Sequence, residues 1–513
     1  MLLCIAAFFA LLFSDLSIAG PQHGHIIKPY EDLQACLARK AVPTSLNSSS
    51  DWISLTTAYN LRLQYTPDAV ALPTSHQQVS DSVLCAATAG VKVKARSGGH
   101  SYGSFSLGGK NNSLVVDLRN FNNVSLDTST GIATVGGGVR LGNLGLGIFE
   151  QGRRALPHGT FPGVGIGGHY THGGFGYSSR RWGLALDTIV AMDVVLADGR
   201  YIHVTRTANP DLYYALRGAA DSVGIITTFY LQTQPAPAQV VSYSSNFSSS
   251  LRSPDSAAAI VLKLQDFVTS SPLVDRNLTL EIYISVFGEY SVRGWYFGDQ
   301  EYFSETILPE MLSGIPVPDN TTVQTATWLT ALEEIAEDEP LKEPLTGYDN
   351  HETFYTKSVV TREAKPLTKT ALESFFTYIV DKGLTTSNPW NTFISLYGGR
   401  DSQINAPSTD SAAYSHRDSL WVFQNVGASP NMLPPFSPEI TAFVNGLNSA
   451  LTDAQPDGDF LAYPSYLDPA LTPTEAARLY YGVSAYNRVA KIKAKVDPKA
   501  VFWNPQAVGN AVL

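Results

Sequence analysis

The chain has 513 residues and a formal net charge of −10, with 45 acidic and 35 basic side chains. Its length exceeds what one hydrophobic core usually supports, so we expect two domains or one large composite fold. The acidic balance argues against a polyanionic partner and excludes nucleic acid as a target.

The N-terminal segment, residues 1–19, predicts a secretory signal peptide. Residues 2–13 form an apolar run, and Ser17-Ile18-Ala19 supplies the small residues of a cleavage site. A short membrane anchor is the alternative, but an apolar run of about 12 residues is too short to span a bilayer. We therefore expect no stable membrane insertion and a protein that is secreted or held in a vesicle of the secretory pathway.

The cysteines and the glycosylation motifs agree with secretion. Cys4 lies inside the signal, which leaves Cys36 and Cys85 in the mature chain. An oxidising compartment favours a disulfide between these two residues, and two buried free thiols are the alternative. The Asn-x-Ser/Thr motif, which accepts N-linked glycans in secreted chains, occurs at Asn47, Asn111, Asn123, Asn246, Asn277 and Asn320.

Between residues 65 and 232, short apolar runs alternate with glycine-rich turns and a few helical stretches. Such a pattern is typical of an α+β domain. The predicted strands are residues 91–93, 114–118, 133–135, 189–196 and 225–231.

After Pro235 and Pro237 the pattern changes and predicts a second domain, an antiparallel sheet backed by helices. A C-terminal helix and an extended tail follow. The predicted helices are residues 257–267, 325–337 and 475–494, the predicted strands are residues 278–287 and 393–396, and the tail is residues 497–506.

Two glycine-rich runs, residues 95–102 and 158–169, carry the main functional signal. Glycine lets the backbone approach a pyrophosphate closely and turn its N–H groups toward it. Together the runs predict a flavin cradle with His100 as a covalent tether. A Rossmann fingerprint is excluded, because the second run lies deep in the chain, follows Pro162 and is not followed by a helix-forming stretch.

The sequence does not support two other kinds of site, a metal site and a serine hydrolase site. His169 and His172 have the outline of a metal pair, but no third ligand lies nearby in the sequence, so we expect no metal. The letters G-x-S-x-G occur around Ser101, yet loop sequence follows where a serine hydrolase needs a strand that turns directly into a helix.

From about Cys36 onward, the chain resembles the flavoproteins of the vanillyl-alcohol-oxidase architecture. Within them it is similar to the branch of berberine-bridge-enzyme-like proteins and gluco-oligosaccharide oxidases. The matching motifs, in chain order, include Tyr59-Asn60-Leu61-Arg62, Arg96-Ser97-Gly98-Gly99-His100, Gly173-Gly174-Phe175-Gly176, Ala197-Asp198-Gly199, Leu216-Arg217-Gly218, Leu396-Tyr397-Gly398-Gly399 and Tyr480-Tyr481-Gly482.

The resemblance implies FAD as cofactor and a two-lobed FAD-binding domain of the PCMH type. We assign this domain to residues 60–235, with residues 20–59 leading into it. Residues 236–460 are expected to form the substrate-binding domain, and residues 461–513 to return to the FAD domain.

The resemblance also implies which residues hold the flavin. His100 is expected to bond to the 8α-methyl carbon of FAD, although a histidine that only caps a turn is the alternative. Phe161 stands where many members carry a second, cysteine tether, so we expect a single attachment. The expected FAD-binding residues are His100, Arg96, Ser97, Gly98, Gly99, Ser101, Tyr102, Pro162, Gly163, Gly165, Gly167, Gly168, His169, Gly174 and Ile226.

Three residues are expected to carry the chemistry. Tyr466 matches the family tyrosine that accepts the proton of the substrate hydroxyl, and it needs a cationic or hydrogen-bonding neighbour to stabilise its phenolate. Gln424 resembles an active-site amide that orients the substrate oxygen, and Val164 matches the position that admits O2 to the flavin. For Tyr466 and Val164, a packing role is the alternative.

Two departures from the sugar-oxidising members bear on the substrate. Ser395 stands where they usually carry an aspartate, and Thr279 where they carry a sugar-binding arginine. We therefore expect a secreted, monomeric oxidase that takes hydride from a small molecule, reduces O2 to H2O2 and tailors a fungal secondary metabolite. Oxidation of an oligosaccharide at its reducing-end C1 hydroxyl is the second hypothesis, and a non-catalytic flavin-binding protein is the third.

Overall fold

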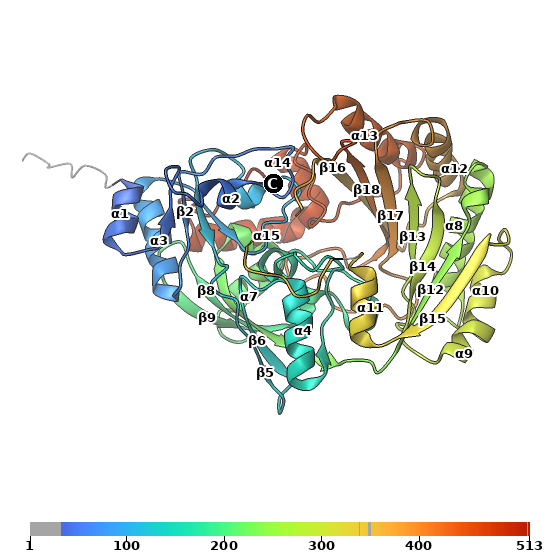
Figure 1. The fold of residues 1–513 in the computed structure, drawn as a ribbon, viewed down its shortest axis with the longest axis horizontal. Coiled ribbons are helices and arrows are strands. Elements are labelled where there is room, and N and C mark those ends of the chain that lie inside the picture. The colour runs from blue at the N-terminus through green and yellow to red at the C-terminus, as the bar shows by residue number, and fades with distance from the viewer. Residues whose placement is uncertain (1–31, 338, 347–349, 510) are drawn as a thin grey trace, which may run out of the picture.

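The computed structural model describes residues 32–337, 339–346, 350–509 and 511–513. The predicted signal peptide and Cys4 lie outside these ranges. Figure 1 shows two parts side by side, with small sheets built from the first half of the chain on the left and one large sheet on the right. The α+β class and the two-part architecture are confirmed.

The N-terminal lobe is built on a four-stranded sheet of order β1-β2-β4-β3, in which β2, β4 and β3 run parallel. A disulfide between Cys36 and Cys85 joins α1 to α3, as predicted, and it stabilises the fold by about 4 kcal/mol on the chain-entropy model. The elements are α1 Leu33–Arg39, β1 Thr44–Ser45, α2 Trp52–Thr56, β2 Ala69–Ala71, α3 His76–Ala89, β3 Val93–Arg96 and β4 Leu114–Asp117.

The second lobe holds a five-stranded antiparallel sheet of order β5-β6-β10-β8-β9. Alternate residues of β6 and β10 are buried, which is the pattern of strands with one face on a core. The elements are β5 Val124–Asp127, β6 Ile132–Gly136, α4 Leu141–Gly152, β7 Arg154–Ala155, α5 Ile166–His169, α6 Ser179–Trp182, β8 Ile189–Val195, β9 Tyr201–Thr205, α7 Pro210–Ala219, β10 Ile225–Gln232 and β11 Gln234–Pro235.

The third unit is a seven-stranded antiparallel sheet of order β15-β12-β14-β13-β17-β18-β16. Helices α8, α12 and α13 cover its outer face (Figure 1), and their apolar sides share one core with the strands. The elements are β12 Val240–Asn246, α8 Pro254–Ser270, β13 Glu281–Ser285, β14 Tyr290–Tyr296, α9 Gln300–Tyr302, α10 Leu308–Leu312, β15 Asn320–Ala326, α11 Trp328–Ile335, β16 Phe354–Arg362, α12 Lys369–Tyr378, β17 Trp390–Leu396, β18 Ser419–Ala428 and α13 Pro438–Thr452.

The C-terminal segment, with α14 Pro473–Ala476 and α15 Gly482–Val496, packs on the first half of the chain. Buried Lys493 donates to the carbonyl of Ser222 at 2.6 Å and to the carbonyl of Phe502 at 2.7 Å, and it pairs with Asp497 at 3.1 Å. A parallel bridge joins Val93 to Phe502. The last residues therefore lie on the N-terminal lobe, while the exact domain boundaries stay a prediction.

Three sequence-based expectations differ from the structure. The helix expected over residues 325–337 begins only at Trp328, because Thr327 caps it by accepting from the N–H of Thr330, and residues 325–326 belong to β15. The helix expected over residues 475–494 is broken at Gly482, whose φ is +69°. The second glycine run does contain a short helix, α5.

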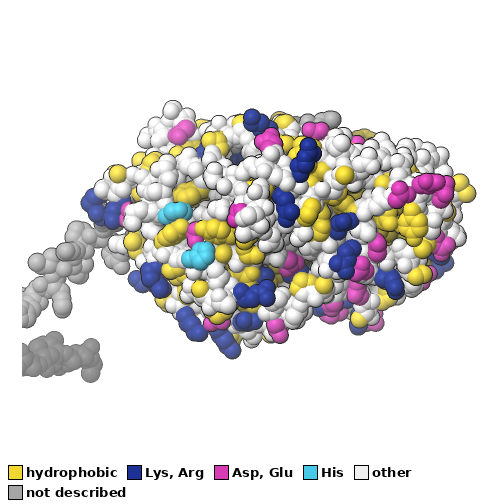
Figure 2. Space-filling view, turned by 90° about the horizontal axis from the view of Figure 1, so that it is seen from below, with side chains coloured by type: hydrophobic (Ala, Val, Ile, Leu, Met, Phe, Trp, Pro, Cys, Tyr) yellow, Lys and Arg dark blue, Asp and Glu magenta, His cyan; other side chains and the backbone are white. Residues whose placement is uncertain are grey.

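The surface agrees with the composition. Figure 2 shows acidic and basic side chains interspersed on one face. Among the residues that the structure describes, no helix is long and apolar enough to cross a membrane. The sequon residues Asn47, Asn111, Asn123 and Asn320 are exposed, whereas Asn246 and Asn277 are half-buried.

Candidate functional site

A cleft of about 920 Å³ runs between the glycine-rich loops and the inner face of the seven-stranded sheet. One wall consists of the predicted FAD-binding runs, with Ile226 beside them. The other wall carries side chains of β12, β14, β13 and β18 and of the segment that contains Tyr466. The cleft is therefore the place where a cofactor on one wall would meet a substrate on the other.

The two glycine runs meet backbone to backbone. A Cβ at Gly98 would lie 2.2 Å from the nitrogen of Gly165, and a Cβ at Gly165 would lie 2.0 Å from the nitrogen of Gly98. No side chain fits at either position. Ser97 connects the same loops, because its hydroxyl donates to the carbonyl of Gly137 at 2.6 Å and accepts from the N–H of Gly167 at 3.2 Å.

Arg140, which the sequence analysis missed, fastens this junction from behind. Its buried guanidinium donates to the carbonyl of Gly98 at 3.1 Å and to the carbonyl of Gly163 at 2.6 Å. These bonds hold the two runs at a fixed separation. A lone arginine between two glycine-rich runs gives no sequence signal, because its partners are main-chain carbonyls.

Other glycines leave the cleft open. A Cβ at Gly168 would meet no protein atom within 4 Å, although the neighbouring Gly98 and Gly165 are tightly packed. Gly99 has a φ of +85°, a conformation that glycine adopts without cost. A wall of close backbone with free space in front of it fits the pyrophosphate and ring system of FAD.

Arg96 lines the cleft, but its side chain has a structural role. Its Nε donates to Asp117 at 2.7 Å, and both groups are buried. The guanidinium thus joins the ends of β3 and β4 and is not available to a phosphate. Any contact of Arg96 with FAD would therefore come from its main chain, because the buried guanidinium pairs with the Asp117 carboxylate.

A charged cluster lies on the same wall. Asp221 accepts from Lys94 at 2.9 Å and from Asn504 at 2.6 Å, and His172 approaches it to 3.4 Å. Burial by itself would raise the pKa of Asp221, but Lys94 and His172 hold it well below its ordinary value. His172 is therefore a partner of a carboxylate. Nowhere in the described part of the chain do three His, Cys, Asp or Glu residues gather as metal ligands.

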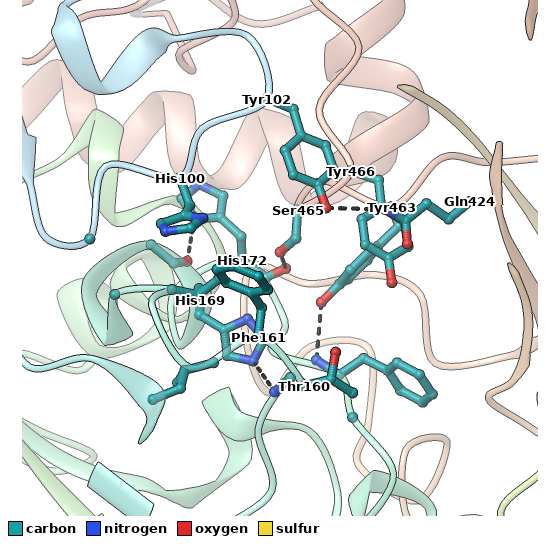
Figure 3. A pocket seen from close by; sticks show the side chains of 18 of the residues that line it. His100, Tyr102, Thr160, Phe161, His169, His172, Gln424, Tyr463, Ser465 and Tyr466 are labelled. Atoms are coloured by element: carbon teal, nitrogen blue, oxygen red, sulfur yellow. Dashed lines mark hydrogen bonds between the residues drawn. The ribbon is translucent and has the colours of Figure 1, made fainter. Parts of the chain in front are cut away.

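His100 lines the cleft and contacts two aromatic rings. The ring centroids of Tyr59 and His100 are 4.1 Å apart, and those of His100 and Phe161 are 5.2 Å apart. His169, labelled in Figure 3, is half-buried, and desolvation lowers its pKa to about 3. Its neutral ring accepts a hydrogen bond from the N–H of Gly159 at 2.9 Å.

Tyr466 lies on the opposite wall among other tyrosines (Figure 3). Its ring is parallel to that of Tyr102 at 6.2 Å and perpendicular to that of Tyr463 at 4.9 Å. Gln424 on β18 donates from Nε2 to the hydroxyl of Tyr102 at 3.1 Å. The Tyr463 hydroxyl accepts from the N–H groups of Gly174 and Phe175 and so ties this wall to the glycine loops.

The electrostatic surroundings of Tyr466 differ from the expectation. Burial is the largest cause that raises its pKa well above 10, and Tyr102, Tyr463 and the Glu281 carboxylate add to it. The contacts described above supply no cation that stabilises the phenolate. The cationic or hydrogen-bonding neighbour expected for Tyr466 is thus not among these contacts. Desolvation therefore makes formation of the Tyr466 phenolate unfavourable.

Glu281 and Arg293 form a charged centre on the substrate wall that sequence reasoning missed. They face each other on adjacent strands β13 and β14, with Arg293 Nε 3.1 Å from Glu281 Oε1. The Tyr177 hydroxyl donates to the same oxygen at 3.0 Å, and Ser395 donates to Glu281 Oε2 at 3.0 Å. The contact depends on strand register, which the linear sequence does not display.

Ser395 and Thr279, the two positions on which the substrate prediction rests, both use their hydroxyls in hydrogen bonds within the protein. Ser395 is 4% exposed and uses its hydroxyl on Glu281, while Thr279 is 3% exposed and donates to the carbonyl of Tyr177 at 2.5 Å. Neither side chain lines the cleft. Glu281 and Arg293, in contrast, do line the cleft on this wall.

Most of the predicted site residues line the cleft. On its wall are Tyr466, Gln424, Val164, His100, Arg96, Ser97, Gly98, Gly99, Ser101, Tyr102, Gly165, Gly167, Gly168, His169 and Ile226. Pro162, Gly163 and Gly174 stand behind it: the carbonyl of Gly163 accepts from Arg140, and the N–H of Gly174 donates to Tyr463. A direct contact of these three with FAD is therefore not supported by their positions.

Comparison with known proteins identifies this architecture. Models of an FAD binding domain and of berberine and berberine-like proteins match residues 67–205 and 442–509. Xylooligosaccharide oxidase from Thermothelomyces thermophilus is 35% identical over 483 residues, which cover 93% of this chain and 94% of that protein. The chain belongs to the berberine-bridge-enzyme-like family of FAD-linked oxidoreductases. It is an FAD-dependent oxidase.

Two further members of this family show its range. The FAD-linked oxidoreductase dpmaF of Metarhizium anisopliae is 34% identical over 482 residues, covering 93% of this chain and 91% of that protein. The structure of glucooligosaccharide oxidase from Acremonium strictum aligns with a TM-score of 0.87 and 32% identity, covering 94% of this chain and 100% of the other. That structure concerns a 6-S-cysteinyl, 8α-N1-histidyl FAD. Covalent flavin thus occurs in the family.

Proposed function

We propose that this oxidase removes hydride from the carbon of an alcohol, or of a similar C–H group, in a small molecule and passes the electrons to O2, which becomes H2O2. The observation that carries this proposal is the position of Tyr466. It faces the cleft from the wall opposite His100 and the glycine loops. A substrate between the walls would have a proton acceptor on one side and the cofactor on the other.

FAD, when bound, supplies the two-electron acceptor. Residues on the glycine wall, with His100 at its centre, would hold it. Tyr466, as phenolate, accepts the hydroxyl proton, and Gln424 orients the substrate oxygen. Val164 is small, branched and half-buried on the cofactor wall, which leaves room for O2 at the reacting face.

A single covalent tether through His100 is part of the proposal. Phe161 stands 5.2 Å from His100, ring to ring, and has no nucleophilic atom to form a second bond. Intact-mass measurement after denaturation tests the tether: His100→Ala should release all flavin. Retention of flavin by that variant would contradict the proposed attachment site.

For the substrate, we propose a secondary metabolite whose reacting end is not a sugar. The oxidation by this enzyme would be one of the steps that modify this metabolite. Support comes from Ser395 and Thr279, whose hydroxyls are buried and bonded within the protein. Aromatic rings of Tyr102, Phe393 and Tyr466 line the region instead. Such rings offer a large apolar contact area to flat or apolar groups.

Oligosaccharide oxidation at C1 is the second candidate, and the outer arm of the cleft favours it. There β12 and β15 present the hydroxyls and amide of Ser242, Ser244, Thr322 and Gln324, with Glu334 beside them. Hydroxyl and carboxylate groups in a row suit a chain of sugar hydroxyls.

An O2-consumption assay with peroxide detection separates these candidates. We would test oligosaccharides of glucose, xylose and N-acetylglucosamine beside aromatic and aliphatic alcohols. Turnover of alcohols without turnover of sugars supports the tailoring function. Turnover of any oligosaccharide at C1 contradicts it and establishes the second candidate.

Secretion and a monomeric state complete the proposal. The Cys36–Cys85 disulfide and four exposed sequon residues support passage through an oxidising compartment. Glycosidase treatment of the secreted protein should lower its mass, and light scattering should give the mass of one chain.

A further inference from the structure

The ring of Tyr59 links His100 to a carboxylate on the wall of the same cleft. Tyr59 lies against the His100 imidazole with centroids 4.1 Å apart and an angle of 34° between the rings. The Phe161 ring lies 5.2 Å from His100 and 6.3 Å from Tyr59, centroid to centroid. The three rings thus form a triangle, and Tyr59 makes the shorter of the two ring contacts with the imidazole.

Tyr59 is in turn fixed by Glu352. The Tyr59 hydroxyl is within hydrogen-bonding reach of the Glu352 carboxylate. The backbones of the two residues are also joined, because the N–H of Glu352 donates to the carbonyl of Tyr59 at 3.0 Å and the N–H of Leu61 donates to the carbonyl of Glu352 at 2.7 Å. Main chain and side chain therefore hold Glu352 in one position relative to Tyr59.

The Glu352 carboxylate is a charged group in a partly desolvated position. Glu352 lines the cleft and is half-buried. Burial raises its pKa, and the bond from Tyr59 opposes this shift. None of the roles assigned above to Tyr466, Gln424 and Val164 uses Glu352. A half-buried carboxylate costs desolvation energy, which the bond from Tyr59 offsets.

We propose that Tyr59 and Glu352 are positioning residues for the covalent attachment of FAD to His100. This inference rests on the proposed His100 tether. Glu352 holds the Tyr59 hydroxyl, and the Tyr59 ring holds the imidazole plane so that a ring nitrogen points at the 8α carbon. Neither residue forms the bond.

The attachment reaction balances with the electron acceptor that the oxidase already uses. A bond forms between an imidazole nitrogen and the 8α carbon, while the imidazole loses its N–H proton and the methyl group loses one hydrogen as a proton. Two electrons remain on the flavin ring, and O2 takes them with the two protons to give H2O2. Because the nitrogen must approach along one direction, misorientation of the imidazole slows this step.

The test follows the attachment rate and not turnover. Protein made with limiting riboflavin is incubated with FAD, samples are denatured in acid, and the flavin that stays with the chain is quantified by intact mass. Tyr59→Leu removes both ring and hydroxyl and should attach about tenfold more slowly. Tyr59→Phe keeps the ring, so we expect a smaller decrease, about threefold.

Glu352 variants test the second link. Glu352→Ala should match Tyr59→Phe, because both lose the same bond. Glu352→Gln should attach at nearly the wild-type rate, since its amide carbonyl still accepts from the Tyr59 hydroxyl. A slow Glu352→Gln with a wild-type-like Glu352→Ala would overturn the positioning role.

The chain offers a matched control. Tyr201 on β9 stacks on His76 of α3 with centroids 4.4 Å apart, and neither residue lines the cleft. Tyr201→Leu removes the same ring from the same kind of pair and should attach FAD at the wild-type rate. If the Tyr59→Leu variant attaches FAD as fast as the Tyr201→Leu variant, the inference is wrong.

The outcomes also separate this inference from the proposed function. Wild-type protein that releases all its flavin on denaturation would overturn the His100 tether and this inference together, while oxidase turnover could still be measured. Wild-type protein that retains its flavin, with all Tyr59 and Glu352 variants attaching at its rate, would overturn this inference alone.

Discussion

The two walls of the cleft are built by different means. On the flavin wall, main chain meets main chain, and Gly98 and Gly165 approach too closely for any side chain. On the substrate wall, side chains such as Glu281 and Arg293 extend from neighbouring strands and bond to one another. A wall of backbone can hold only one shape, whereas a wall of side chains can change its chemistry without changing the fold.

The substrate wall should therefore yield the largest loss of rate without loss of flavin. We expect Tyr466→Phe to lower kcat/KM by about 10²- to 10⁴-fold, because the proton acceptor is gone. In the wild type, the raised pKa of Tyr466 means that the phenolate is scarce at neutral pH and increases about tenfold per pH unit. The wild-type rate should thus rise with pH, and the variant's should not.

Tyr302→Phe is the matched control, since Tyr302 lies exposed on α9. It should leave both the rate and its pH dependence unchanged. A flat pH profile of the wild type across neutral and alkaline pH would contradict the role of Tyr466 as a phenolate base.

The flavin wall should be sensitive to changes behind it. Lys493 ties the C-terminal segment to Ser222 and Phe502. Lys493→Met leaves the buried Asp497 carboxylate without its cation, and we expect a loss of about 3 to 5 kcal/mol of folding free energy. Denaturant titration measures it. Lys495→Met, exposed on the same helix, should change stability by less than about 0.5 kcal/mol.

Two glycines on the flavin wall separate packing from cofactor space. Gly98→Ala forces a Cβ against Gly165 and should cost about 1 to 3 kcal/mol even without flavin. Gly168→Ala meets no protein atom, so the flavin-free protein should keep its Tm while its affinity for FAD falls. If both variants lose the same stability, the distinction between packed and open glycines is wrong.

The smallest expected effect is on the stability of the fold at acid pH. The pKa of Asp221 is held well below its ordinary value of 3.8, so the unfolded state binds its proton first as pH falls. The stabilisation is present above about pH 4 and is lost as pH decreases toward the folded-state pKa. Asp221→Asn should cost about 1 to 2 kcal/mol at neutral pH and should flatten the dependence of stability on pH below 4. An unchanged acid profile would contradict the depressed pKa.

The same contrast explains what could be predicted from the sequence. Gly98 and Gly165 were predicted because close approach of two backbones needs glycine, and glycine-rich runs are visible in the sequence. His100 was predicted because it follows the glycines of the first of these runs and matches the family motif. Glu281 and Arg293 were missed because their contact depends on the register of β13 and β14. Arg96 was assigned to the cofactor because its segment resembles the family's, but the burial that pairs its side chain with Asp117 is a tertiary property.

The central claim, that this protein is an oxidase with reactive flavin between these walls, is tested most directly by reoxidation. The flavin of the purified holoprotein is reduced by light without O2, mixed with O2 in a stopped-flow instrument and followed by its absorbance. We expect reoxidation within seconds or faster, with one H2O2 formed for each flavin. A reduced flavin that persists for many minutes in air-saturated buffer would contradict the claim.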